Sequence, residues 1–259
     1  MTYCLGIITE SGLVMAADSR TNAGVDYVST YRKLFDFSIA GDRVILLATS
    51  GNLSVTQEAL SMLEKDIKTG SDPNLHNLTS MYEIAAYVGK KVRQIQEQHR
   101  QWLEKDQIDY QCSLLLGGQL QDEAPELYLI YSQGNFIQAT QETPFLQIGE
   151  TKYGKPLLDR TITYQTPWRA AAKCALLSID STMKSNISVG PPINLIGYEH
   201  NSFQINHQLT LKLGAPYLVK IRKSWESVVK EAFDRMPDID WDHHQEAAID
   251  EATENMFVD

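Results

Sequence analysis

Apolar and polar residues alternate near the start of the chain in the manner of β-strands. Strand-like runs cover Tyr3–Thr9, Leu13–Ala17, Leu34–Ile39 and Arg43–Thr49. Short runs of this kind, bounded by Gly, Asp, Asn and Ser, are typical of hairpins. The pattern therefore predicts two hairpins, separated by a polar loop over residues 18–30.

The hydrophobic period changes to that of a helix after Ser50-Gly51-Asn52. Apolar side chains recur at helical spacing up to Ile67, and Ser54 with Gln57 forms a candidate capping box. A second and longer helix is predicted over Ser80–Asp106, where Ser80 and Glu83 form another capping box. Two consecutive helices therefore follow the second hairpin.

The second half of the chain is also predicted to contain strands and helices, but they do not alternate strictly. Strands are predicted over Cys112–Leu120, Glu126–Ser132, Asn135–Thr140, Phe145–Gly149, Pro192–Tyr198 and Phe203–Leu211, and helices over Trp168–Met183 and Tyr217–Phe233. A doubly wound parallel sheet requires regular βαβ units, which this order lacks. We therefore expect an α+β fold, with two antiparallel sheets covered by helices.

Composition narrows the class of protein. The chain has 259 residues, of which 43% are hydrophobic and 9% aromatic, enough to bury a large core. It contains no apolar run of about 18 residues, and its start lacks a basic segment, so we expect neither a membrane span nor a signal peptide. Cys4, Cys112 and Cys174 are far apart and odd in number, which favours reduced thiols and a cytoplasmic location.

Charge is concentrated at the C-terminus. The formal net charge is −10, and residues 231–259 hold ten acidic residues against one basic residue. We expect a single domain over residues 1–235 and an acidic tail over 236–259. The chain lacks the clustered Lys and Arg residues that nucleic-acid binding requires, so we expect no nucleic-acid partner. The tail contains Trp241, Ile249 and Phe257, so docking on a neighbouring subunit and exposure to solvent both stay open.

Two weaker motifs do not carry the function. Residues 149–156 approach a phosphate-binding loop, but Pro156 occupies the position that requires a hydroxyl, so a turn from strand to helix is favoured. His243 and His244 lie among acidic residues, yet adjacent side chains on a helix diverge, which favours a solvated tail over a metal site. We expect no metal and no organic cofactor.

Thr2 carries the candidate chemistry. It follows Met1, which is normally removed before a residue as small as threonine, so the mature chain is expected to begin at Thr2. Its hydroxyl would then lie beside a free α-amine with an ordinary pKa of about 7.7–8.0. Such an amine can act as general base for the hydroxyl, directly or through water. A Met-Thr start alone is common, and the context decides its meaning.

That context consists of four motifs in order. They are Met1-Thr2-Tyr3-Cys4, the segment Asp18–Asp26, the segment Arg32–Phe35, and Thr49–Asn52 before the first helix. In these motifs the chain resembles the proteasome β-type family of N-terminal nucleophile hydrolases, and within it the bacterial ancestral β subunit (Anbu) group. The resemblance extends over roughly residues 2–235 and is strongest over residues 2–57.

The resemblance implies roles for particular residues. Thr2 matches the nucleophile, Lys33 the lysine beside its hydroxyl, and Asp18 the carboxylate that pairs with that lysine. A positive charge at Lys33 would favour the deprotonated forms of the hydroxyl and the amine. Gly51 matches the residue whose N–H faces the developing oxyanion. Arg20 matches a structural arginine near the site.

Two supporting positions depart from the family pattern. A serine is expected near the nucleophile where this chain has Gly149-Glu150-Thr151. The later Asp-x-x-Ser-Gly element is imperfect, and Asp180 and Ser185 are the candidates for its roles, with a plain helix-end cap as the alternative. Thr21, Tyr31, Thr49, Leu53 and Gln57 match positions of the first specificity pocket and indicate no sharp preference.

For the fold and the function, the resemblance implies a four-layer αββα sandwich and a threonine-type peptidase or amide hydrolase. It also implies self-association into ring-like or helical homo-oligomers that act on peptide or protein substrates, with Ser80–Asp106 as the expected subunit contact. Activation would require only removal of Met1. Two alternatives stay open: a catalytically weak or inactive assembly scaffold, and an N-terminal nucleophile amidase or acyl transferase that acts on a small substrate.

Overall fold

Two five-stranded antiparallel sheets form the centre of the molecule. The computed structural model describes residues 2–22 and 28–239. The first sheet has the order β10-β1-β2-β11-β12 and the second the order β5-β6-β7-β8-β9. The strands of the first sheet are β1 (Tyr3–Thr9), β2 (Gly12–Ala17), β10 (Phe145–Gly149), β11 (Ile193–Glu199) and β12 (His207–Leu211). Those of the second are β5 (Leu34–Asp36), β6 (Arg43–Gly51), β7 (Cys112–Leu120), β8 (Glu126–Ile130) and β9 (Phe136–Gln138).

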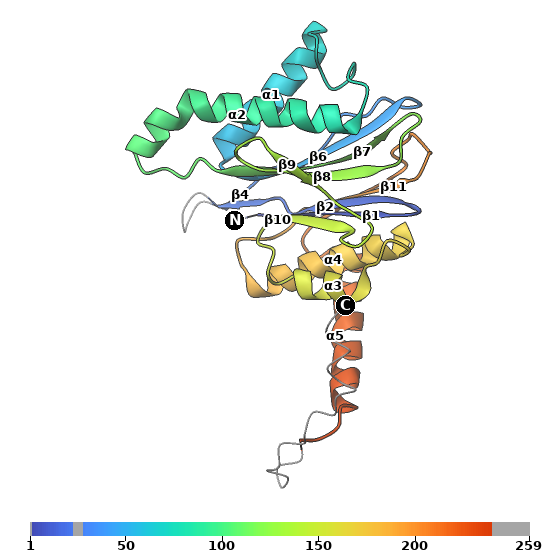
Figure 1. Ribbon diagram of the computed structural model, residues 1–259. Helices are drawn as coiled ribbons and strands as arrows, with labels where there is room; N and C mark the ends of the chain where they lie inside the picture. The colour runs from blue at the N-terminus through green and yellow to red at the C-terminus, as the bar shows by residue number, and fades with distance from the viewer. Residues whose placement is uncertain (1, 23–27, 240–259) are drawn as a thin grey trace, which may run out of the picture. The chain divides into compact units, whose positions relative to one another are not determined.

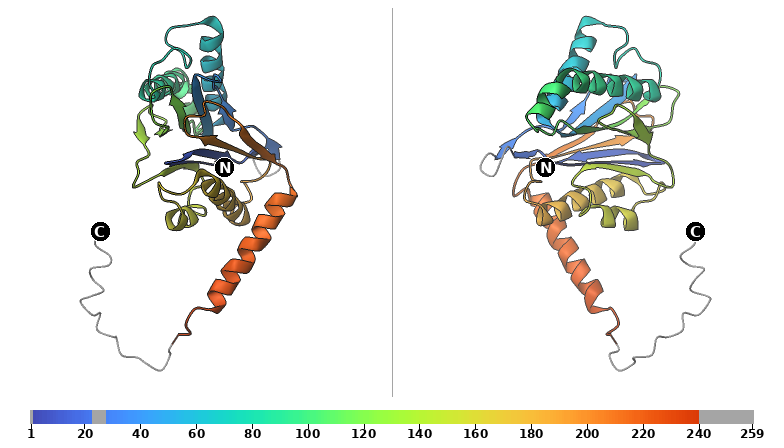
Figure 2. Two further views of the ribbon diagram at one scale, coloured as in Figure 1. Left: turned by 90° about the vertical axis from the view of Figure 1, so that its right-hand side faces the viewer. Right: turned by 60° about the vertical axis from the view of Figure 1, so that its left-hand side comes forward.

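Helices cover the outer face of each sheet. Helices α1 (Leu53–Thr69) and α2 (Met81–Lys105) lie on the second sheet, and α3 (Lys155–Thr161) and α4 (Trp168–Ser185) lie on the first. Figures 1 and 2 show the resulting order of layers, which is helix, sheet, sheet, helix. The expected four-layer αββα sandwich is therefore confirmed.

Three apolar clusters fill the spaces between these layers, and β1 contributes to two of them. Every residue of β1 and β2 is buried. Alternate side chains point to opposite faces of a strand, so Tyr3 faces the α3–α4 layer while Cys4 faces the second sheet. Burial on both faces explains why β1 is apolar at almost every position, which corrects the alternation expected from the sequence.

Local sequence signals set the ends of the helices. Ser80 caps α2 by accepting a hydrogen bond from the amide of Glu83, as the capping box predicts. The capping box proposed at Ser54 and Gln57 is wrong, because α1 begins at Leu53. Its cap is Asn52, whose side-chain oxygen accepts from the amides of Ser54 and Val55.

Two other segments differ from the prediction. The polar loop over residues 18–30 contains the short strands β3 (Arg20–Asn22) and β4 (Val28–Thr30), which pair with each other. The strand predicted from Phe203 begins only at His207, because Phe203 has a φ of 47° and turns the backbone. The turn from strand to helix predicted over residues 149–156 is confirmed, because it connects β10 with α3.

The chain divides into two compact units, Met1–Arg222 and Lys223–Asp259. The boundary falls within α5 (Pro216–Asp234), and the predicted division after residue 235 stays a prediction. Met1, the histidine pair 243–244 and the apolar tail residues at 241, 249 and 257 lie outside the described residues. None of the helices that the structure describes is long and apolar enough to span a membrane.

Truncation in the layer between the sheets should lower stability strongly. Leu46 is completely buried there, so Leu46→Ala is expected to reduce the free energy of unfolding by about 2–5 kcal/mol through lost burial and a cavity. Urea unfolding of the purified protein measures this. As a control, Ile108→Ala removes a side chain that is 48% exposed and should change the value by less than about 0.5 kcal/mol. Equal effects of the two variants would contradict the packing described above.

Candidate functional site

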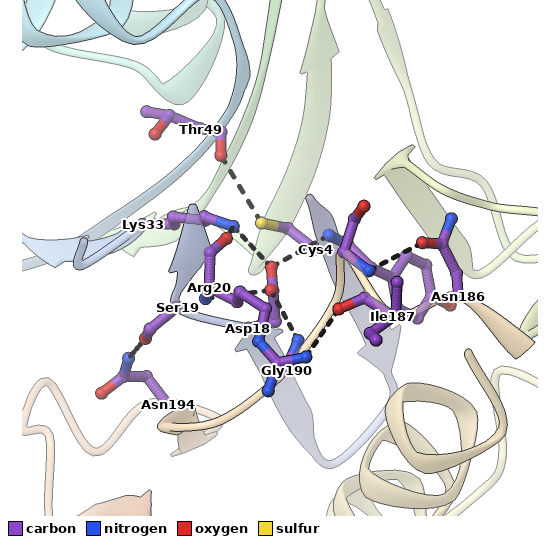
Figure 3. A network of polar contacts seen from close by, with 12 residues as sticks. Cys4, Asp18, Ser19, Arg20, Lys33, Thr49, Asn186, Ile187, Gly190 and Asn194 are labelled. Atoms are coloured by element: carbon purple, nitrogen blue, oxygen red, sulfur yellow. Dashed lines mark hydrogen bonds and ion pairs between the residues drawn. The ribbon is translucent and has the colours of Figure 1, made fainter. Parts of the chain in front are cut away.

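Asp18 is the centre of the candidate site. It follows the last residue of β2, and its side chain is completely buried. Its Oδ1 accepts from the amide of Tyr3 at 3.0 Å and from Nζ of Lys33 at 2.8 Å. Its Oδ2 accepts from the amides of Arg20 and Gly190 at 3.1 and 3.0 Å (Figure 3). Four donors thus compensate a carboxylate that is removed from water.

Lys33 supplies the charge that balances this carboxylate. It directly precedes β5 and is 4% exposed. Besides Asp18, its Nζ donates to the carbonyl oxygen of Arg20 at 2.6 Å. Its own carbonyl accepts from the amide of Thr49 on β6 at 2.9 Å. The ammonium of Lys33 is therefore held by Asp18 and Arg20, while the backbone carbonyl of Lys33 is fixed to the second sheet.

Thr2 is placed beside this ion pair through its backbone. The amide that follows it, that of Tyr3, shares Oδ1 of Asp18 with Lys33. The carbonyl of Thr2 accepts from the amide of Glu150 at 2.7 Å. An ideal Cβ at Gly149 would lie 1.9 Å from this carbonyl oxygen and 3.1 Å from Oγ of Ser50, so these two atoms are neighbours. Position 149, with a φ of 85°, consequently requires glycine.

Tyr3 anchors the strand that carries Thr2. Its hydroxyl forms a hydrogen bond of 2.7 Å with Ser178 on α4 and accepts another from Nε2 of Gln147. Burial raises the pKa of Tyr3 to about 12, so the phenol stays neutral at physiological pH. The side chain is completely buried, which restricts movement of the backbone next to the candidate nucleophile.

Cys4 lies close to the ion pair but is unsuited to nucleophilic chemistry. Its thiol donates to the carbonyl oxygen of Thr49 across the two sheets at 3.6 Å. Burial raises the pKa of the Cys4 thiol well above its usual range, and the reactive form of cysteine is the thiolate. Cys4, Cys112 and Cys174 are all free and buried.

Gly51, the expected oxyanion residue, ends β6 directly before α1. It is exposed and has a φ of 105°, and an ideal Cβ there would lie 2.3 Å from the carbonyl oxygen of Gln111. Its neighbour Ser50 is next to Gly149, so this end of β6 lies close to Thr2. Among the expected pocket residues, Thr49 is buried whereas Gln57 is exposed.

The loop over residues 186–190 completes the support of Asp18, and the sequence analysis missed it. The amide of Gly190 donates to Asp18, while its carbonyl accepts from the amides of Ser19 and Arg20. Nη1 of Arg20 donates to the carbonyl oxygen of Ile187 at 2.6 Å (Figure 3). Arg20 therefore connects this loop with the segment that follows Asp18, and its role in the site stays a prediction.

Asp180 and Ser185 are not brought to this cluster. Asp180 is buried and accepts from Nε of Arg222 at 2.8 Å and also from its Nη2. Ser185 is exposed at the last position of α4. The residues that approach Asp18 come from the loop after the helix, and the glycine at position 190 was the available signal.

Glu150 is the second feature that sequence reasoning left without a role. It is 5% exposed, and its Oε2 accepts from Nδ2 of Asn186 at 2.9 Å. Oδ1 of Asn186 in turn accepts from the amide of Ser188. Glu150 therefore connects the carbonyl of Thr2, through its own amide, with the loop that supports Asp18, through its carboxylate.

Neither a metal cluster nor the cavity beside α4 and β12 explains this site. Among the described residues, no group of three or more His, Cys, Asp or Glu side chains is placed to hold a metal ion. A cavity of about 660 Å³ is lined by Trp168, His207 and Tyr217 among others, and includes none of the residues proposed for catalysis. The acid–base cluster, rather than cavity size, therefore identifies the candidate site.

Removing the lysine should destabilise the protein because Asp18 would keep its charge in a buried position. For Lys33→Met we expect a loss of about 3–5 kcal/mol in the free energy of unfolding. The double variant Asp18→Asn/Lys33→Met should lose less than the sum of the two single variants, since it leaves no unpaired charge. Urea unfolding is measured for the unmodified protein, Asp18→Asn, Lys33→Met and the double variant. Additive losses in the free energy of unfolding would contradict the coupling of the two residues.

The comparisons with known proteins agree with the fold described above. The family model described as "Proteasome subunit" matches residues 2–195. Among solved structures, Anbu from Yersinia bercovieri is 42% identical, with a TM-score of 0.88, and the match covers 93% of this chain and 100% of that one. The helical assembly of the Anbu complex from Pseudomonas aeruginosa is 41% identical, with a TM-score of 0.88 and coverage of 93% and 99%.

Anbu from Hyphomicrobium sp. strain MC1 is 39% identical, with a TM-score of 0.83 and coverage of 92% and 100%. No match is found among the curated proteins. The fold, the order of motifs and these similarities lead to one conclusion: the chain belongs to the proteasome subunit family of N-terminal nucleophile hydrolases, in its Anbu group.

Proposed function

We propose that the protein is a threonine-type peptidase or amide hydrolase that uses Thr2 after removal of Met1. The observation that carries the proposal is the buried pair of Asp18 and Lys33, in which Oδ1 of Asp18 also accepts from the amide of Tyr3, the residue after Thr2. A buried ion pair usually stabilises a fold no better than well-packed apolar residues of the same size. Its placement next to the N-terminal threonine therefore supports a chemical role.

In the first half of this mechanism, the free α-amine of Thr2 takes the hydroxyl proton, directly or through one water. The Thr2 oxygen attacks the carbonyl carbon of the scissile amide, and the ammonium of Lys33 favours the charged form of that oxygen. The N–H of Gly51 donates to the oxyanion of the tetrahedral intermediate. Collapse breaks the C–N bond, and the leaving amine receives the proton from the α-ammonium group.

In the second half, water releases the acyl group. The α-amine takes a proton from the water, whose oxygen attacks the ester carbon of the acyl-enzyme. The intermediate then collapses and returns the proton to the oxygen of Thr2, which leaves a free carboxylic acid. Every step is a proton transfer or an acyl transfer, so the residues named here suffice for the chemistry.

We also propose that the protein works as a ring-like or helical homo-oligomer. The support is the similarity to an Anbu complex described as a helical assembly. Tyr82 and Trp102 on α2 are 61% and 62% exposed, which fits a role of this helix in subunit contacts. Three free, buried cysteines support a reducing compartment such as the cytoplasm.

A non-catalytic scaffold is the main rival hypothesis. A scaffold has no need of a buried aspartate and lysine beside an N-terminal threonine, because apolar residues of similar volume would serve stability as well or better. No feature of the described residues favours the scaffold, so we retain the hydrolase as the proposed function.

The nucleophile can be tested by mass spectrometry with an epoxyketone probe, which needs both the hydroxyl and the free amine of an N-terminal residue. We expect loss of Met1 and a single adduct on Thr2. Thr2→Ala should give no adduct, whereas Thr2→Ser keeps the hydroxyl and should still be labelled. Hydrolysis of a peptide substrate that persists unchanged in Thr2→Ala would overturn the proposal, as would a chain that loses Met1 but is never labelled.

A second test concerns Glu150. Glu150→Ala removes the acceptor for Asn186, so the loop behind Asp18 should loosen and kcat should fall about tenfold or more, with a smaller change in KM. Glu150→Gln keeps an acceptor oxygen and should retain activity within about threefold.

Lys152→Ala is the matched control for Glu150. The ammonium of Lys152 is 3.8 Å from the carboxylate and its side chain is 74% exposed, so its removal should leave kcat nearly unchanged. Equal kcat values for Glu150→Ala, Glu150→Gln and the unmodified enzyme would show that Glu150 does not position the site.

A further inference from the structure

A second cavity lies directly behind the support of Asp18 and has no part in the mechanism above. Its volume is about 340 Å³, within the usual range of small-ligand sites. Its apolar lining includes Met183, Val189, Pro191 and Leu218, and two guanidinium groups, those of Arg20 and Arg222, complete it. We propose that this cavity binds the free α-carboxylate of a C-terminal residue with an apolar side chain.

Arg20 provides the recognition of the carboxylate. A guanidinium carries five N–H donors in a rigid fork, and among the described residues the Arg20 group meets one acceptor, the carbonyl of Ile187. The group lies flat against Gly190, where an ideal Cβ would be 2.4 Å from its Cζ. Its plane is thereby fixed, which suits bidentate binding of a carboxylate.

The balance of charge in the cavity also favours an anion. Arg222 is held by Asp180, so this pair is neutral as a unit. The guanidinium of Arg20 has no carboxylate partner among its contacts in the described part of the chain, so it contributes one positive charge to a lining that is mostly apolar. A ligand with one carboxylate and one apolar side chain matches both features, whereas a phosphate or a sugar would bury polar groups against Met183 and Leu218.

The cavity is physically connected with the candidate active site. The amide of Arg20 donates to Oδ2 of Asp18, and its carbonyl accepts from Nζ of Lys33. Val189 directly precedes Gly190, whose amide donates to the same carboxylate. A ligand on Arg20 and Val189 therefore contacts the residues that hold the pair of Asp18 and Lys33, and its binding should order them.

The nature of the ligand depends on the proposed function, although the site itself does not. Hydrolysis of a peptide amide releases a fragment with a new α-carboxylate, so the ligand belongs to the class of the reaction products. Binding of cleaved peptide in the cavity would then change the reactivity of Thr2. The expected response is faster acylation of Thr2, because a better ordered ion pair is closer to its working arrangement.

Binding can be measured on the full-length protein by isothermal titration calorimetry with N-acetyl-leucine. N-acetyl-leucinamide has the same shape without the charge and should bind at least about tenfold more weakly. The titration is repeated with Thr2→Ala, where we expect the same affinity. That result separates this proposal from the proposed function, because it stands even if Thr2 is not a nucleophile.

Val219 offers a matched pair of variants for locating the ligand. It lines the cavity and is 38% exposed, so substitutions should be tolerated there. Val219→Glu places a like charge next to the carboxylate and should weaken binding about tenfold or more, whereas Val219→Gln has nearly the same size and should retain it. Equal affinity in the two variants would place the ligand elsewhere and overturn the proposal.

The connection with the active site is tested by the rate of epoxyketone labelling. Saturating N-acetyl-leucine should increase the rate of labelling of Thr2 about fivefold, and N-acetyl-leucinamide should not. The increase should disappear in Val219→Glu and persist in Val219→Gln. A decrease in the labelling rate that is equal in Val219→Glu and Val219→Gln would mean that the ligand competes at Thr2, and it would contradict the connection. An absence of binding heat in all proteins would refute the site.

Discussion

The buried ion pair of Asp18 and Lys33 is the interaction around which the site is arranged. Removing two charges from water is expensive, and their attraction compensates this only when the remaining lone pairs and protons are also satisfied. The structure meets this demand with amides of Tyr3, Arg20 and Gly190 around the carboxylate and with the Arg20 carbonyl at the ammonium. Each donor comes from a different segment, so the pair fixes the start of β1, the exit from β2 and the loop before β11 at one point.

The layered fold determines why this pair can be buried at all. Both faces of β1 and β2 are covered, one by the second sheet and the other by α3 and α4. Thr2 lies at the end of such a strand, where the carbonyl of the residue is still paired with Glu150 but the side chain is only half-buried. The same strand therefore carries a completely buried Tyr3 and, one residue earlier, a half-buried Thr2.

Short-range signals were sufficient for much of the fold. The strands β1 and β2 follow from apolar runs, and the start of α2 follows from Ser80 and Glu83, because both depend on residues close in sequence. The position of Lys33 next to Asp18 required the family motif, since fifteen residues separate them. Gly190 lies 172 residues from Asp18, and no periodic pattern connects the two. Asp180 was a reasonable candidate by spacing, but its side chain is paired with Arg222.

The acid–base residues of the site all belong to one chain, and this bears on what assembly contributes. Asp18, Lys33 and the support from Gly190 and Glu150 are linked by hydrogen bonds within the described residues of a single copy. A homo-oligomer is therefore not needed to bring these groups together. Its contribution would be to restrict which substrates reach Thr2, while the surroundings of the ion pair determine how fast Thr2 reacts. These two properties would then be separable by mutation, since α2 and the loop at 186–190 are different parts of the molecule.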